Sequence, residues 1–239
     1  MYPDHDVKSY KLLAKVAASD PVQVAARREL ASITAQTFEV VGTELHVVDH
    51  FLGTDRKNGV SPFGHGSDEI VAVSLLLRIA AQLVSASNDL FADGRHYAAA
   101  ALLRQLVEVE YLAWAFAARD NDAERWLRSS VDDRRTFFTP AKLRQAAGSK
   151  FRGTDYGYHC EFGGHPVPRS ATLLNGNEVS CQLLLSDLLG HTGCIWDNLL
   201  DWSAGRPWAI AIHKRKEAMS LSYASWKNID KLLNLPPPP

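Results

Sequence analysis

The sequence predicts an all-α fold, a single-domain helical bundle of about eight or nine helices. Its apolar residues recur at spacings of three and four far more often than at two, and runs of alternating β-branched residues are nearly absent. With 239 residues and 46% hydrophobic content, the chain has enough apolar material for one large buried core. No internal repeat or interdomain linker interrupts it, so we expect one domain over residues 1–235 and a flexible proline tail over residues 236–239.

Three helices are predicted in the N-terminal half, and their ends carry caps or breakers. Asp20 followed by Pro21 marks a helix start, because Asp suits the N-cap and Pro the first turn. Ser67, followed by two acidic residues, marks another start, and Asp93-Gly94 breaks that helix. The predicted ranges are 4–18, 20–51 and 67–90, with a loop rich in Gly, Pro and Asn over 53–66.

The most apolar predicted helix covers residues 95–120, and we expect it at the centre of the bundle. Two weaker helices follow, the second with Thr139 as its cap and Pro140 in its first turn. A last pair of helices is joined by Ala204-Gly205-Arg206. The predicted ranges are 123–130, 140–147, 178–203 and 207–233.

Arg104 and Glu108 form a charged pair, four residues apart, inside the most apolar helix. Apolar neighbours such as Leu103 and Val107 surround the pair, so we expect both charges to be at least partly buried. Burial of such charges is unfavourable unless each is paired and hydrogen-bonded. The pair therefore indicates either an ion pair that fixes helix register or a site that binds something polar.

The stretch YGYHCEFGGHPVPRS, residues 156–170, concentrates reactive side chains between helical segments. His165 is preceded by two glycines and followed by a proline, so we expect it just beyond a helix end, where an imidazole can face a cavity. His159, Cys160 and Glu161 precede it and point in different directions on a helix. At most two of these four side chains can then share one site.

Metal binding has weak support in the sequence. His46 and His50 are one helical turn apart and could ligate one divalent metal with a carboxylate from another helix. No Glu-x-x-His pair of the di-iron kind occurs, so we expect no metal or other cofactor and keep His46 and His50 as the weaker alternative. His191 lies in an apolar stripe of its predicted helix and is interpreted as a satisfied core histidine.

Charge and composition predict an ordinary cytoplasmic protein. Lys and Arg number 26 against 27 Asp and Glu, so no global field draws the chain to nucleic acid or to a membrane. The N-terminus lacks the pattern of a signal peptide, and no apolar run approaches the ~20 residues of a membrane span. Three cysteines without CxxC spacing favour reduced thiols, and the basic run at 213–216 is typical of a solvated face.

Two motifs together resemble a known family. The segment AAAALLRQLVEVEYLAWAFA, which contains Arg104 and Glu108, is followed later by Tyr-x-x-x-Cys-Glu-Phe-x-x-His-Pro from Tyr156 to Pro166. This combination resembles a family of bacterial helical proteins of unknown function, which is in turn similar to the HEPN superfamily and its abortive-infection relatives. The match covers roughly residues 95–166. The resemblance implies a helical bundle, a homodimer and a role in stress or phage defence.

Active HEPN proteins cleave RNA without a metal, using an Arg and a His a few residues apart. Histidine can deprotonate the 2′-hydroxyl that attacks the phosphate, and arginine can stabilise the charge that develops on the phosphate oxygens. Here the resemblance implies Arg152 with His159, or His165 with Arg104 and Glu108 from another helix. In the second alignment, Gly157 stands where the family arginine would be expected.

The same resemblance implies Tyr156, Tyr158 and Glu161 as substrate-binding residues, with RNA or a nucleotide as substrate and a cognate antitoxin or other protein as partner. A competing interpretation is a non-catalytic helical module. In that case Arg104, Glu108, Tyr156 and His165 form a buried polar network that fixes the bundle or binds a small ligand or protein partner. Sequence reasoning leaves both interpretations open.

Overall fold

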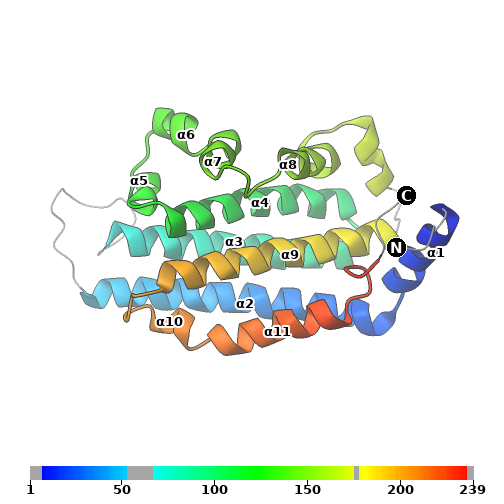
Figure 1. The fold of residues 1–239 in the computed structure, drawn as a ribbon, viewed down its shortest axis with the longest axis horizontal. Coiled ribbons are helices and arrows are strands. Elements are labelled where there is room, and N and C mark those ends of the chain that lie inside the picture. The colour runs from blue at the N-terminus through cyan, green and yellow to red at the C-terminus, as the bar shows by residue number, and fades with distance from the viewer. Residues whose placement is uncertain (1–6, 53–66, 175–177, 236–239) are drawn as a thin grey trace.

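The computed structural model describes the fold of residues 7–52, 67–174 and 178–235, and these residues form α-helices and short helical turns without a strand (Figure 1). The predicted all-α class is confirmed, and nine of the described α-helices have seven or more residues. The α-helices are α1 (Val7–Ala18), α2 (Pro21–Leu52), α3 (Asp68–Ala92), α4 (His96–Ala118), α5 (Asp122–Leu127), α6 (Val131–Phe137), α7 (Pro140–Ala146), α8 (Gly153–His159), α9 (Glu178–Ser203), α10 (Ile210–His213) and α11 (Lys216–Ile229). A π-helical turn η1 (Cys160–Gly164) and a 3₁₀ turn η2 (Pro168–Leu173) complete the set.

Four long helices form an elongated bundle in which α2 packs on α3, α3 on α4, and α4 on α9 (Figure 1). The short helices α5–α8 lie along one side, over α4, and α10 and α11 lie along the opposite side, next to α2. Fully buried Phe38, Leu103 and Trp202 belong to the core between the long helices, and Phe38 stacks on Trp196 at a ring-centroid distance of 6.4 Å. Helix α4, which the sequence placed at the centre of the bundle, packs on α3 and α9 and is covered on its other side by short helices.

The predicted helix over 207–233 is wrong in one respect, because it is two helices. In a continuous α-helix the amide of Arg215 would donate to the Ala211 carbonyl, but here it donates to the Ile212 carbonyl. The Arg215 guanidinium donates to the Ala211 carbonyl instead, at 3.0 Å. The same guanidinium pairs with Glu44 on α2, at 2.6 Å. The ion pair with Glu44 lies at the break between α10 and α11, and it ties part of the predicted basic run to the bundle.

Helices α6 and α8 form where the sequence predicted no helix or only a weak one. Helix α6 was not predicted, and it begins with a reciprocal pair of hydrogen bonds between Ser130 and Asp133. Helix α8 forms although Gly153 and Gly157 make poor helix. Its continuation η1 packs against α4, where a Cβ on Gly163 would lie 2.3 Å from the backbone carbon of Ala100. Tertiary contact therefore stabilises a segment of weak helical propensity.

Polar side chains join α2, α9 and α11 in a fully buried cluster. The Arg27 guanidinium donates to both carboxylate oxygens of Asp230 at 2.7 Å and to Gln182 at 3.0 Å. Asp230 also accepts from the Ser186 hydroxyl at 2.9 Å and from the Trp226 indole at 2.7 Å. We refer to these five residues as the Arg27 cluster.

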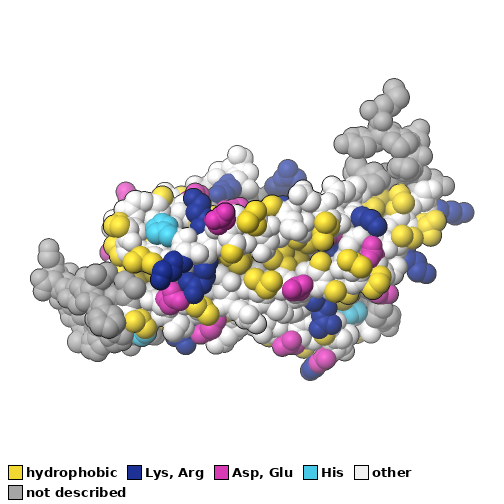
Figure 2. Space-filling view, turned by 90° about the horizontal axis from the view of Figure 1, so that it is seen from below, with side chains coloured by type: hydrophobic (Ala, Val, Ile, Leu, Met, Phe, Trp, Pro, Cys, Tyr) yellow, Lys and Arg dark blue, Asp and Glu magenta, His cyan; other side chains and the backbone are white. Residues whose placement is uncertain are grey.

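The face that carries α10 and α11 mixes hydrophobic side chains with both signs of charge (Figure 2). Its exposed apolar residues include Ile210, Leu221 and Ile229. Among the described residues, one helix, α3, is long and apolar enough to cross a membrane by length and composition, and 61% of its most apolar window is buried inside the bundle. The core helices of soluble proteins share this length and composition, so the feature is weak evidence for a membrane span.

Candidate functional site

Arg104 and Glu108 meet Tyr156 in a closed network between α4 and α8. The Arg104 guanidinium lies 2.9 Å from the Glu108 carboxylate. The Tyr156 hydroxyl accepts from Arg104 and donates to Glu108, each at 2.9 Å. Burial and the hydrogen bond to Glu108 raise the pKa of Tyr156 to about 12, so its hydroxyl stays protonated and can donate. The three side chains bond to one another and thereby hold α8 on α4, while Nε of Arg104 is buried outside these contacts.

The other candidates from the stretch at 156–170 do not join this network. The His165 side chain is exposed, and no hydrogen bond joins its ring to Arg104 or Glu108 in the described part of the chain. Its backbone is extended, with φ −138° and ψ 145°, so the predicted helix end before His165 is confirmed. Tyr158 and Glu161 are also exposed. The proposed polar network thus forms without His165.

The remaining predicted residues lie elsewhere. Arg152 is exposed and caps the N-terminus of α8. His46 is half-buried on α2, while the His50 side chain lies outside the described residues.

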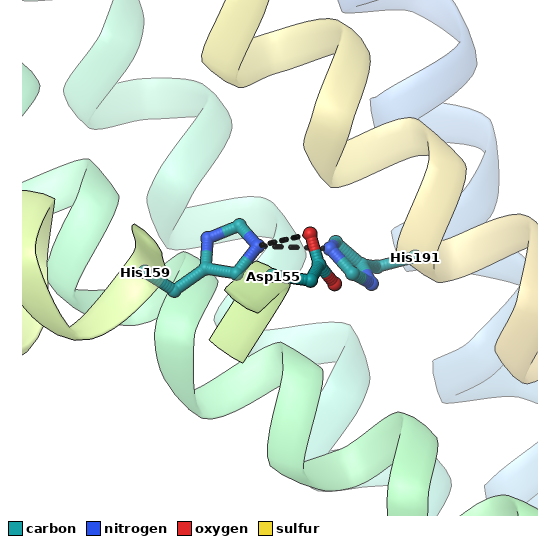
Figure 3. A group of neighbouring side chains, drawn as sticks. All are labelled: Asp155, His159 and His191. Atoms are coloured by element: carbon teal, nitrogen blue, oxygen red, sulfur yellow. Dashed lines mark hydrogen bonds and ion pairs between the residues drawn. The ribbon is translucent and has the colours of Figure 1, made fainter. Parts of the chain in front are cut away.

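His159 and His191 face each other across α8 and α9 (Figure 3). Their Nε2 atoms are 3.1 Å apart, and the ring planes make an angle of 72°. Each histidine follows an aspartate by four residues on its own helix, so Asp155-x-x-x-His159 on α8 meets Asp187-x-x-x-His191 on α9. Because positions four apart share one helix face, each helix presents a carboxylate and an imidazole to the other.

The two carboxylates lie close to the facing ring nitrogens. The Asp187 oxygens are 3.5 Å from Nε2 of His159 and 3.6 Å from Nε2 of His191. An Asp155 oxygen is 3.8 Å from Nε2 of His159 and also lies within 4.8 Å of the His191 donor atom. The His159 side chain is only 1% exposed, whereas that of Asp155 is 47% exposed. The cluster therefore runs from the core out to the surface.

Glu110 on α4 holds His191 from behind. Its carboxylate oxygen accepts from Nδ1 of His191 at 2.6 Å, and its side chain is 8% exposed. This contact directs Nε2 of His191 toward His159. We refer to Glu110, Asp155, His159, Asp187 and His191 as the Asp–His cluster.

Burial and mutual charge shift the pKa values of this cluster in different directions. Burial, and then the charge of His191, lower the pKa of His159 to about 4, so this ring is neutral near pH 7. Burial also disfavours a charged His191, but the hydrogen bond to Glu110 and the charge of Asp187 outweigh it and raise the pKa of His191. Burial raises the pKa of Asp187 to about 6. A neutral His159 offers a nitrogen lone pair at the centre of the cluster.

A cavity of about 670 Å³ opens beside the Asp–His cluster. Its lining combines acidic, basic and apolar side chains from α4, α8, α9, α11 and the segments next to them. The acidic members are Glu110, Asp155 and Asp187, and the basic ones are Lys150, Arg152 and Lys227. His191 also lines this cavity, so a group bound at its Nε2 would be close to the cavity.

The donor spacing of the Asp–His cluster fits a divalent metal ion. Zinc lies roughly 2.0–2.1 Å from its nitrogen and oxygen ligands, so two ligand atoms on a tetrahedral ion are about 3.3 Å apart. The distances that join the Nε2 atoms of His159 and His191 to each other and to the nearest oxygens of Asp155 and Asp187 are 3.1, 3.5, 3.6 and 3.8 Å. Asp155, His159 and His191 each offer one donor atom that lies within 4.8 Å of the other two. Glu110 on the outer nitrogen of His191 matches the carboxylate that commonly supports a metal-bound histidine.

Sequence reasoning did not find this cluster. His191 was interpreted as a core histidine, and it is indeed largely buried and hydrogen-bonded to Glu110, but it also lines the cavity. A signal was present in the repeated spacing Asp-x-x-x-His, which occurs twice in the whole sequence, at 155–159 and 187–191. That the two occurrences face each other is set by the packing of α8 and α9 on α4.

Comparisons with protein-family models, with curated protein sequences and with solved structures found no match.

Proposed function

We propose that the protein is a divalent-metal-dependent hydrolase whose metal ion is held between α8 and α9. The observation that carries this proposal is the convergence of two Asp-x-x-x-His pairs, with donor distances of 3.1 to 3.8 Å, at the wall of a cavity. Asp155, His159 and His191 would supply three ligand atoms that all lie within 4.8 Å of one another, and Asp187, with oxygens 3.5 and 3.6 Å from the two Nε2 atoms, would supply a fourth.

The donor set indicates which ions would bind. Imidazole suits zinc, iron, nickel and copper, and carboxylate suits harder ions such as manganese, so two of each favour a borderline first-row metal. Two nitrogens and two oxygens leave positions open on a six-coordinate ion. In a four-coordinate ion, loss of the exposed Asp155 would leave one position open.

An open position beside the cavity supplies hydrolytic chemistry. A divalent ion held there would lower the pKa of a bound water, to ~7 for zinc, and would polarise the bond that is attacked. Glu110, hydrogen-bonded to Nδ1 of His191, keeps that ring oriented toward the ion. Because His159 and His191 are largely buried, their orientation changes little when the site is filled.

Metal analysis of protein purified without a metal-affinity tag tests the centre. We expect about one equivalent of a first-row metal per chain, removed by a chelator and restored by titration. His159→Ala and His191→Ala should abolish binding, while His165→Ala, on the exposed histidine of the same stretch, should retain it. Circular dichroism establishes whether each variant is folded. If a histidine variant does not fold, Asp187→Asn replaces it as the test of metal binding. Folded wild-type protein that binds none of these metals would refute the proposal.

A second candidate, implied by the resemblance to HEPN proteins, is metal-independent RNA cleavage. It is favoured by the position of Arg152, which lines the same cavity as His191 and begins the helix that His159 ends. Incubation with total RNA, with and without EDTA, separates the two candidates. Cleavage that survives EDTA and disappears in Arg152→Ala and His159→Ala supports the second. The homodimer that the resemblance implies is measured by light scattering on the same preparations.

The non-catalytic interpretation is favoured by the network of Arg104, Glu108 and Tyr156, in which the Tyr156 hydroxyl bonds to both charged partners. It predicts that the protein neither binds metal nor cleaves RNA, and that Arg104→Ala loses folded protein. A folded Arg104→Ala variant with normal metal content would argue against it.

A further inference from the structure

We propose that the cavity beside the metal centre binds a small phosphate ester, and that the metal must be present for this anion to bind. The inference rests on the proposed metal centre and adds its substrate class. It starts from the basic side chains of the cavity. Lys150 and Arg152 precede α8 in the chain and Lys227 lies on α11, so cationic groups reach the cavity from two sides.

Lys150 and Lys227 both have polar or charged neighbours outside the cavity. Lys150 donates from Nζ to the Asn198 side chain at 3.3 Å, which fixes its direction. Asp197 lies near Lys227 and Lys150: burial raises its pKa, and both lysines oppose that shift. Asp197 is not part of the lining, so it offsets some of the positive charge without occupying the cavity.

The balance of formal charge depends on the metal. With neutral histidines, the lining carries three basic side chains and three carboxylates, which cancel, and Asp197 makes the region negative by one. A proton on His191, whose pKa is raised, brings the metal-free region to zero. A phosphate is therefore not attracted to the metal-free cavity. A divalent ion reverses the sign to positive by one and adds a direct ligand for a phosphate oxygen. Arg152 can then pair with the remaining oxygens, because a guanidinium matches phosphate geometry.

The apolar part of the lining indicates the size and type of ester. Phe151, Trp226 and Leu233 share the cavity with the charged groups. Its volume of about 670 Å³ lies within the range of small-molecule sites, roughly 300–1,000 Å³. A phosphate at the metal would leave room for an organic group against these side chains, as in a nucleotide-sized monoester. The limited volume of the cavity favours such a molecule over a folded RNA.

Calorimetric titration of inorganic phosphate into metal-loaded and metal-free protein tests the coupling. We expect phosphate to bind at least about 10-fold more tightly to the loaded form, and the metal to bind more tightly in phosphate by the same factor. Equal phosphate affinity in the two forms would overturn this inference and leave the metal centre standing. Failure of the metal itself to bind would instead remove the proposed function on which the inference rests.

Matched variants test the assignment of the cations. Lys227→Met and Arg152→Met should each weaken phosphate binding to the loaded protein several-fold and leave metal affinity unchanged. Lys216→Met is the control, because Lys216 is exposed on the same helix as Lys227 but does not line the cavity. A loss of phosphate affinity in the control equal to that in Lys227→Met would contradict the proposal. So would binding of an RNA oligonucleotide by loaded protein that binds neither phosphate nor a nucleoside monophosphate.

Discussion

Helix α9 contributes to two polar clusters of opposite character, one fully buried and one that reaches the surface. In the Arg27 cluster, one cation meets one carboxylate, and Gln182, Ser186 and Trp226 occupy their remaining hydrogen-bonding positions. In the Asp–His cluster, three carboxylates surround two imidazoles, and one side opens on a cavity. A cluster that satisfies itself stabilises the fold, whereas one with surplus negative charge beside a cavity is suited to a cation from outside.

The largest expected effect is the loss of Arg27. In Arg27→Met the Asp230 carboxylate, which is 1% exposed, stays buried without its partner, so we expect the free energy of unfolding to fall by about 3–5 kcal/mol. Metal content should not change. Chemical denaturation measures the first quantity and elemental analysis the second.

The matched control is the double variant Arg27→Met with Asp230→Leu, which removes both charges and should recover much of the stability. A loss below about 1 kcal/mol in the single variant would show that the pair does not hold the helices together.

The pH dependence of the free energy of unfolding isolates the contribution of the Arg27–Asp230 pair. Burial acts to raise the pKa of Asp230, but the hydrogen bonds and charge of Arg27 outweigh it and hold that pKa below its ordinary value. The folded-state pKa is the lower one. The contribution to stability is therefore complete above the ordinary aspartate pKa of ~3.9 and is lost as pH falls through the folded-state value.

Denaturation at several pH values from 7 to ~3 measures this loss. The difference in stability between wild type and Asp230→Asn should shrink as the pH falls over the acidic end of that series. A difference that stays constant with pH would mean that Asp230 does not take up a proton on unfolding.

For the Asp–His cluster, Glu110→Gln should affect metal binding more than stability. The amide keeps the size of the side chain but loses the charge behind His191, so we expect metal affinity to fall about 10- to 100-fold. Glu108→Gln is the matched control, because Glu108 lies on the same helix and contacts Tyr156 instead. If both variants bind metal as wild type does, Glu110 does not support the centre.

The network of Arg104, Glu108 and Tyr156 is intermediate between the two clusters, since it is closed but only partly buried. Tyr156→Phe removes the hydroxyl that joins the other two, so we expect a loss of about 1 kcal/mol in the free energy of unfolding. Metal affinity should stay near that of wild type if the packing of η1 also holds α8 in place. A large fall in metal affinity would show that Tyr156 positions the neighbouring Asp155.

The sequence indicated the pairing of Arg104 with Glu108 but neither of the two clusters, and the reason is distance along the chain. Arg104 and Glu108 are one helical turn apart, so their pairing is visible in the sequence. Arg27 and Asp230 are 203 residues apart, and Arg27 stands next to other charged residues, as on a solvated face. Helical periodicity fixes which face each Asp-x-x-x-His pair occupies, but only the packing of α8 and α9 brings the pairs together.

The smallest expected effect concerns Gly157, where the family resemblance would place an arginine. Nothing lies within 4 Å of a Cβ built at this position, so Gly157→Ala should fit without strain. Alanine favours a helix over glycine by about 0.8–1.0 kcal/mol, and α8 should become more stable by up to that amount. Because the Asp–His cluster depends on where α8 lies rather than on its flexibility, metal affinity should be unchanged.

Gly163→Ala is the contrasting variant: its Cβ would collide with Ala100 on α4, so it should destabilise the protein and weaken metal binding together. If Gly157→Ala also weakened metal binding, the cluster would require a mobile α8, and the rigid centre inferred from the buried histidines would be wrong.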